Sequence, residues 1–569
     1  MRRSVTAVAA LSLCVLLLAV FLLVQFAPAL SLSFAGDDFE LLSLARISGL
    51  RGAAIASPRR GLFVKPVMSA TWALLVRLFG AHPAPWFAVC LATHLTNAAL
   101  LGLLARQLAT SWSRGREVEP GTAAWMGLGT VAIWAVHDRL SEPVYSISAW
   151  NHSLAFAFYL AALLSLLRAL QRGSRAGLLQ FAFFSLLGLL TYEVDLSLLP
   201  VSALLVLLHP SPASRLASLP VPPHPLPSEW GWRRRLAFAG PYLAGVAALY
   251  GAVRLAILLN SPWKSYDFVS PAIAPRNISE IFLAFFHLRC GSIAPPVLAG
   301  AALAGFLAVC FILIKDPAAR FGLGWFAAAS LMVSVIPEYS DRYHYIPFAG
   351  LALTAACLLR GSLLPRCVFA CALVAHLIVS FGGSREQATW YALKGSLHSR
   401  LLEQVRDGFD RPAQDVGAGA SRASGGEGHA GPLIAVVWDA GPGGSARLEA
   451  AAASVPRRFG DPLYPLYLRP KAVAQLVYAA DLLNVARAEQ GEFYRTPEPA
   501  RAAQAITDRA LQIIPIEEAR QEPPARLLSD IRNGLLSRHE VPVALGPMRI
   551  AYLEPTDRMG AFASEYGLH

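Results

Sequence analysis

Two adjacent carboxylates follow directly on the first long apolar run of the sequence. The run extends from Val5 to Leu32, and Asp37 and Asp38 stand just beyond it. An acidic pair at the mouth of a membrane helix is costly near hydrocarbon, so it is a candidate for function. A carboxylate at such an interface can have its pKa raised by partial desolvation, and it can then accept a proton from a hydroxyl group. The alternative interpretation is a solvated loop that ends the first helix.

The composition is that of a membrane protein. Hydrophobic residues make up 55% of the 569 residues, and charged residues only 15%. The net charge of +12 is carried by arginines in short loops between apolar runs. That placement is the cytoplasmic positive bias of membrane proteins and argues against a nucleic-acid partner. The seven cysteines form no C-x-x-C pair, so they indicate neither a zinc site nor a disulfide framework.

The apolar runs predict about eleven transmembrane helices. They lie near residues 5–30, 84–106, 121–137, 147–167, 177–191, 195–208, 236–259, 295–314, 321–337, 344–359 and 364–382. The shorter run Val67–Phe79 carries Arg77 and is predicted to lie in the membrane interface. With Arg2 and Arg3 in the cytoplasm, this count puts the basic loops on the cytoplasmic side, as the positive-inside rule requires.

The polar residues at the other helix ends then gather on the non-cytoplasmic face. They are Asp37 and Asp38, His137 to Glu142, Glu193 and Asp195, the segment 260–296, and Asp341 to Tyr343. Each of them alone is typical of a solvated helix end. Together at one membrane boundary, they indicate the rim of a site.

The chain is predicted to have three parts. Residues 1–383 form a transmembrane domain, and residues 384–430 an amphipathic helix with a flexible linker rich in Gly, Ala and Ser. Residues 431–569 predict a small α/β domain on the non-cytoplasmic side. Its expected strands are 433–438 and 548–553, and its expected helices are 472–489 and 499–514.

Short motifs in residues 30–355 resemble those of the C-type integral-membrane glycosyltransferases, which take sugars from polyprenyl-phosphate carriers. The likeness is closest to the transmembrane O-mannosyltransferases and their bacterial relatives. The matching motifs are Gly36-Asp37-Asp38-Phe39, His94-x-x-Asn97, His137-Asp-Arg-Leu-Ser-Glu142-Pro-Val144 and Asp341-Arg342-Tyr343-His344-Tyr345-Ile346-Pro347. The last is similar to the family's Glu-Arg-Tyr-x-Tyr-x-Pro segment and is the most specific of them. Lys65-Pro66 and Tyr192-Glu193 stand where the family commonly has Arg-Pro and Lys-Glu.

The resemblance implies the C-type glycosyltransferase fold and an inverting transfer to an acceptor hydroxyl on the non-cytoplasmic face. Asp37 is expected to be the general base, and Asp38 to hold a divalent cation (Mg²⁺ or Mn²⁺) or to orient the acceptor. The leaving phosphate requires cations and hydroxyl donors. Arg342, Tyr343, Tyr345 and Lys65 are expected to supply them. His137, Glu142 and Glu193 are expected to bind sugar hydroxyls or to complete a metal site.

The resemblance also implies a bacterial inner-membrane protein with a cytoplasmic N-terminus and a periplasmic C-terminal domain. It leaves the acceptor open among glycan, lipid and protein. A transporter or flippase of lipid-linked sugars is an alternative, but it is expected to show inverted repeats and charges at mid-membrane depth. A non-catalytic membrane scaffold is another. At single positions, His94 with Asn97 also fits an interhelical hydrogen-bonded pair, and Tyr343 with Tyr345 fits interfacial anchors.

Overall fold

The computed structural model describes most of the membrane part of the chain. The described residues are 2–34, 38, 42, 45, 65–80, 82–112, 120–209, 231–260, 273–288, 305, 307, 310–312, 314–336, 340–416, 433–435, 536–542 and 549–555. The chain divides into two compact units. The first contains Met1–Leu32 and Ser48–Thr389, and the second contains Ser33–Ile47 and Trp390–His569.

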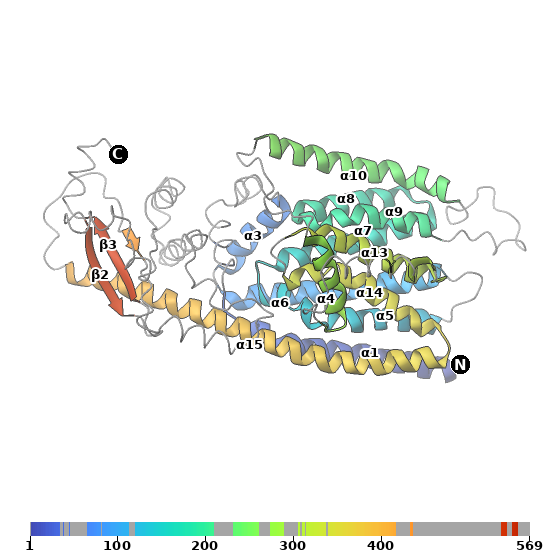
Figure 1. Cartoon of the computed structure of the whole chain (residues 1–569), viewed down its shortest axis with the longest axis horizontal. Coiled ribbons are helices and arrows are strands. Elements are labelled where there is room, and N and C mark those ends of the chain that lie inside the picture. Colours follow the sequence, from blue (N-terminus) through green and yellow to red (C-terminus); the bar gives the residue numbers. More distant parts are fainter. Residues whose placement is uncertain are drawn as a thin grey trace, which may run out of the picture. The chain divides into compact units, whose positions relative to one another are not determined.

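The first unit is a bundle of helices. Its long and medium helices are α1 (Arg2–Phe26), α3 (Pro66–Phe79), α4 (Pro83–Ser111), α5 (Pro120–Ala135), α7 (Trp150–Arg172), α8 (Arg175–Thr191), α9 (Leu198–Leu208), α10 (Trp232–Asn260), α11 (Ala274–Phe285), α13 (Pro317–Ser334), α14 (Pro347–Ala356) and the start of α15 (Leu363–Val416). Short elements between them are η1 (Ala27–Ser31), η2 (Asp138–Leu140), α6 (Glu142–Tyr145), η3 (Glu193–Ser197), η6 (Asp341–His344) and η7 (Cys357–Arg360). Figure 1 shows that the axes of α1, α5, α7, α8 and α10 lie nearly parallel to one another.

The helices follow the apolar runs of the sequence. Each predicted span coincides with a helix except 295–314, most of which lies outside the described residues. Within the part of the chain that the structure describes, five helical segments are long and apolar enough to cross a membrane: Val8–Ser31, Pro83–Ser111, Trp150–Arg172, Trp232–Ala256 and Leu363–Thr389. The protein is therefore a helical polytopic membrane protein.

Local sequence sets many helix ends. Proline begins α3, α4, α13 and α14, where its missing N–H costs nothing and its fixed φ favours the helix. Asp316 caps α13 by accepting hydrogen bonds from the backbone N–H groups of Ala318 and Ala319. Gly173 ends α7 in the left-handed conformation (φ 67°), which glycine adopts without steric cost.

Small residues and buried polar groups hold the bundle together. Helices α13 and α14 approach so closely at Gly322 and Gly350 that a Cβ on either glycine would meet the other's carbonyl oxygen. The Asn97 amide on α4 donates to the Ser153 carbonyl on α7 at 2.7 Å, and the His94 Nε2–H donates to the Ala135 carbonyl at 2.9 Å. This confirms the interpretation of His94 and Asn97 as an interhelical pair.

Helix α15 is continuous from Leu363 to Val416, so the predicted amphipathic stretch from residue 384 is the extension of the last apolar helix. In the second unit, the strands β1 (Leu433–Ala435), β2 (Leu536–Pro542) and β3 (Arg549–Pro555) form an antiparallel sheet in the order β1-β3-β2. The predicted strands at 433–438 and 548–553 coincide with β1 and β3, and β2 was not predicted. The predicted helices at 472–489 and 499–514 lie outside the described residues.

Candidate functional site

Two motif segments that are far apart in sequence lie against each other at one end of the bundle. The first follows α5 and contains η2 and α6, and the second contains η6. The Arg139 guanidinium contacts the Asp341 carboxylate at 3.0 Å between Nη1 and Oδ1. Glu142 Oε2 accepts a hydrogen bond from the Arg342 backbone N–H at 2.8 Å and another from the Ser340 hydroxyl. Each segment therefore donates a hydrogen bond to a carboxylate of the other, and these contacts hold the two segments together.

The Arg342 side chain is held beside a carboxylate and an aromatic ring. Its Nε lies 3.8 Å from Glu142 Oε1, and its guanidinium carbon lies 5.6 Å from the Tyr343 ring centroid. The side chain retains 27% of its exposure. An arginine that is oriented but still accessible is suited to bind an anionic oxygen group.

A second cation reaches the same region from α3. The Lys65 ammonium lies 4.1 Å from the Tyr192 ring centroid. The His152 ring lies 4.3 Å from the Tyr192 ring and 5.3 Å from the Tyr343 ring, so it links the two tyrosines. We call Lys65, His152, Tyr192, Arg342 and Tyr343 the cationic aromatic cluster. It combines two fixed positive charges with phenol groups, the chemistry that a phosphate ligand requires.

Tyr192 stands where the resemblance expects a lysine. Burial raises the pKa of its phenol well above the usual value, and the Tyr343 phenol raises it further, so Tyr192 is a neutral hydrogen-bond donor at physiological pH. The positive charge expected at this position comes instead from Lys65, which lies over the ring.

Glu193 contacts a cation from another helix. Its Oε1 lies 2.6 Å from Nη1 of Arg254 on α10. This ion pair, at 19% and 14% side-chain exposure, fastens η3 to α10. The contact supports a positioning role for Glu193, because its carboxylate already neutralises a charge.

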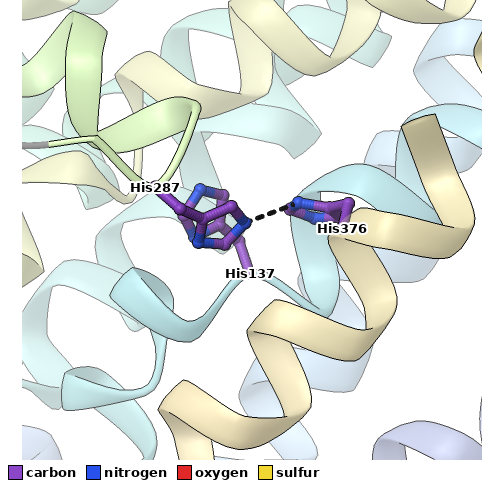
Figure 2. Close-up of side chains that lie close together, drawn as sticks. All are labelled: His137, His287 and His376. Atoms are coloured by element: carbon purple, nitrogen blue, oxygen red, sulfur yellow. Dashed lines mark hydrogen bonds between the residues drawn. The ribbon is translucent and has the colours of Figure 1, made fainter.

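His137 lies in a different environment from Glu142. It is fully buried at the end of α5, next to His287 from the end of α11 and His376 from α15 (Figure 2). Among the described residues, these three histidines form the group of metal-ligating side chains that is close enough to hold an ion. Imidazoles do not favour Mg²⁺ or Mn²⁺, so this group does not fit the cation expected at Asp38.

Tyr345 is not brought to the cationic aromatic cluster. It is fully buried, its hydroxyl lies 2.7 Å from His94 Nδ1, and the Asn97 amide donates to the same oxygen at 3.3 Å. The expectation that Tyr345 contacts the donor phosphate, or anchors at the interface, does not agree with this position. It faces the core because η6 turns the chain between Tyr343 and Tyr345.

The acidic pair is described in part. Asp37 lies outside the described residues, whereas Asp38 is described, is 1% exposed and belongs to the second unit. The sequence interpretation did not assign a role to Arg139, Ser340 or Asp341. Arg139 and Asp341 both lie inside the quoted motifs, and their opposite charges are the signal that could have paired them.

The likeness of this chain to known proteins is one of structure. No family model matches the chain, and no curated protein matches it. Among solved structures, the crystal structure of ArnT from Cupriavidus metallidurans bound to undecaprenyl phosphate is similar to this chain. The similarity covers 95% of this chain and 98% of ArnT, at 14% sequence identity and a TM-score of 0.44.

Proposed function

We propose that this protein is a membrane glycosyltransferase that moves a sugar from a polyprenyl-phosphate carrier to an acceptor hydroxyl on the non-cytoplasmic face. The observation that carries the proposal is the contact between the two motif segments. Glu142 binds the Arg342 backbone and lies beside its guanidinium, although the two residues are 200 positions apart. Residues that resemble one family's motifs thus meet in one place, next to a cluster of cations and phenols.

The cationic aromatic cluster is the proposed donor-phosphate site. As the glycosidic C–O bond breaks, negative charge develops on the leaving phosphate, and Arg342 and Lys65 stabilise it. The Tyr192 and Tyr343 hydroxyls donate hydrogen bonds to the same oxygens. The ion pairs Arg139–Asp341 and Glu193–Arg254 hold the surrounding segments in place.

Asp37 is the proposed general base, which takes the acceptor's proton as the new bond forms on the opposite face of the sugar. Asp38 is proposed to orient the acceptor or to hold a divalent cation. Both assignments stand on the sequence. The proposed acceptor is a glycan, a lipid or a protein hydroxyl, and the proposed location is a bacterial inner membrane with a cytoplasmic N-terminus.

The test uses the full-length protein in proteoliposomes with a polyprenyl-phosphate-linked sugar that is labelled in the sugar. Formation of free polyprenyl phosphate and loss of label from the lipid are measured together. This reports transfer whatever the acceptor, and it separates transfer from flipping, which leaves the carrier intact. Arg342→Ala and Lys65→Ala are expected to raise the donor KM at least about tenfold, the effect of losing a charge-assisted hydrogen bond.

Asp37→Asn is expected to abolish turnover without changing the donor KM. The matched control is Arg366→Ala, which removes an exposed arginine whose Nε donates to the Leu359 carbonyl. If all variants cleave the donor at the wild-type rate, or if the wild type moves the intact lipid without cleaving it, the proposed function is wrong.

A further inference from the structure

Three histidines from separate elements converge beside the motif segment that carries Glu142. His137 follows α5, His287 follows α11, and His376 lies in α15 (Figure 2). One nitrogen from each lies within 4.8 Å of the others. His137 is fully buried, and the His287 side chain is 17% exposed. The proposed transfer reaction assigns no role to this group.

Backbone carbonyls fix which nitrogens carry protons. His376 Nε2 lies 2.8 Å from the Ile133 carbonyl, and His137 Nε2 lies 3.3 Å from the Phe285 carbonyl. A carbonyl oxygen only accepts, so each Nε2 carries the hydrogen and, in the neutral ring, each Nδ1 carries a lone pair. His137 Nδ1 accordingly accepts the Arg139 backbone N–H at 3.3 Å. Histidine ligands of metals are usually held in this way, with the distal N–H on a carbonyl.

The lone pairs point toward further acceptors. Asp138 Oδ1 lies 3.1 Å from His137 Nδ1 and 3.1 Å from His287 Nδ1. Because His137 Nδ1 carries a lone pair, the contact between His137 and Asp138 brings two acceptor atoms together. His376 Nδ1 lies 2.9 Å from His287 Nε2, and a neutral His287 can donate either to His376 through Nε2 or to Asp138 through Nδ1, but not to both. Electron-rich atoms therefore face one another in a buried place, an arrangement that a cation stabilises.

The backbone of His287 supplies an independent observation. Its φ is +58°, and it is the only non-glycine residue with positive φ among those described. It stands just past α11, where the Leu288 N–H bonds the Leu283 carbonyl at 2.9 Å, the helix-ending turn in which glycine is usual. A side chain in this conformation costs about 1–2 kcal/mol. Such strain persists where the side chain is needed, and here it brings the imidazole into the group.

We infer that His137, His287 and His376 bind a divalent transition-metal ion of the Zn²⁺ class, with the Asp138 carboxylate beside them. His376 binds through Nδ1 and His287 through Nε2, and His137 binds through Nδ1, which gives up its long contact with the Arg139 N–H. Tetrahedral zinc with bonds of about 2.0–2.1 Å requires donor atoms roughly 3.3 Å apart, so nitrogens that lie within 4.8 Å of one another must move closer by at most about 1.5 Å. Three protein ligands leave one tetrahedral position for a further group, and the ion joins the ends of α5 and α11 to α15 next to the segment that positions Arg342.

The test measures metal binding rather than sugar transfer, so it is independent of the proposed function. Full-length protein in detergent is stripped with a chelator, re-equilibrated with Zn²⁺ and analysed for bound metal by mass spectrometry. The wild type is expected to bind about one Zn²⁺ per chain and to unfold at a higher temperature with Zn²⁺ than without. Mg²⁺ is expected to give neither effect, because imidazole ligands do not favour it.

His287→Gly is the decisive variant. Glycine is the preferred residue at this left-handed position, so the variant keeps the turn and removes only the ligand. It is expected to fold, to bind Zn²⁺ at least tenfold more weakly, and to show no thermal response to Zn²⁺. His376→Ala is expected to do the same, and His82→Ala, which removes an exposed histidine, is expected to match the wild type. A wild type that retains no more Zn²⁺ than His287→Gly would overturn the site and leave a proton-sharing histidine group.

Discussion

The Arg342 backbone N–H donates a hydrogen bond to Glu142 Oε2 at 2.8 Å, and the Arg342 Nε lies 3.8 Å from the other oxygen of the same carboxylate. One carboxylate thus fixes both the main chain and the side chain of the arginine. The Ser340 hydroxyl donates to the same carboxylate, so Glu142 also holds the residue that precedes η6. This relationship makes Glu142 a positioning residue for the proposed donor-phosphate site.

The first prediction separates the charge of Glu142 from its role as a hydrogen-bond acceptor. Glu142→Ala leaves the Ser340 hydroxyl and the Arg342 N–H without their acceptor and is expected to cost about 1.5–3 kcal/mol of stability. Glu142→Gln keeps an acceptor oxygen, so it is expected to unfold near the wild-type temperature while it changes the donor KM through Arg342. Thermal unfolding in detergent and donor-dependent rates check this. Equal loss of stability in both variants would contradict the assignment.

The second prediction contrasts the two tyrosines of one motif. Tyr345→Phe removes the hydroxyl that His94 and Asn97 share, and it is expected to lower stability by about 1–3 kcal/mol with the donor KM unchanged. Tyr343→Phe is expected to raise the donor KM several-fold, because Tyr343 belongs to the cationic aromatic cluster. The measurements are thermal unfolding and the dependence of rate on donor concentration. The reverse pattern would mean that Tyr345, not Tyr343, faces the donor.

The third prediction concerns pH. Burial raises the pKa of Asp341 from 3.8 to about 7, with Glu142 and Asp138 adding to the rise and Arg139 opposing it. The folded state therefore keeps a proton that the unfolded state loses near pH 4. The resulting stabilisation is complete below about pH 4 and disappears as the pH rises through about 7.

Asp341→Asn tests this, because the amide cannot titrate. The unfolding temperature of the wild type relative to Asp341→Asn is expected to fall as the pH rises from about 4 to about 7 and to level off above that. The other titrating groups are the same in both proteins, so their effect on the unfolding temperature cancels in this difference. A difference that stays constant from about pH 4 to about 7 would show that the pKa of Asp341 is not raised in the folded protein.

The fourth prediction concerns the contact between α13 and α14. A Cβ on Gly350 would meet the Gly322 carbonyl oxygen and the backbone of Phe326, neither of which can move without separating the helices. Gly350→Ala is therefore expected to destabilise the protein by about 1–3 kcal/mol. Gly245→Ala, on α10 with nothing within 4 Å of the added carbon, is the matched control and is expected to be neutral or stabilising. Thermal unfolding of both variants in one detergent compares them.

The sequence by itself determined the long apolar helices of the first unit, but not α11, which lies in the segment 260–296. Hydrophobic runs, proline at first helical positions and the cap at Asp316 act over a few residues, so they can be read without the fold. The interhelical role of His94 and Asn97 could also be predicted, because polar groups on an apolar helix must find partners. The continuity of α15 could not be predicted from the sequence. The polar stretch from residue 384 changes the surroundings of the helix without breaking its backbone.

Only the tertiary structure decided which motif residues share a site. Spacing along the chain put Tyr343 and Tyr345 together, but the turn of η6 sends one to Arg342 and the other into the core. The pair Arg139–Asp341 and the group of His137, His287 and His376 join residues distant in sequence, through contacts that depend on how helices pack. Local sequence fixes local backbone, whereas the direction of a side chain and its distant partner are set by packing.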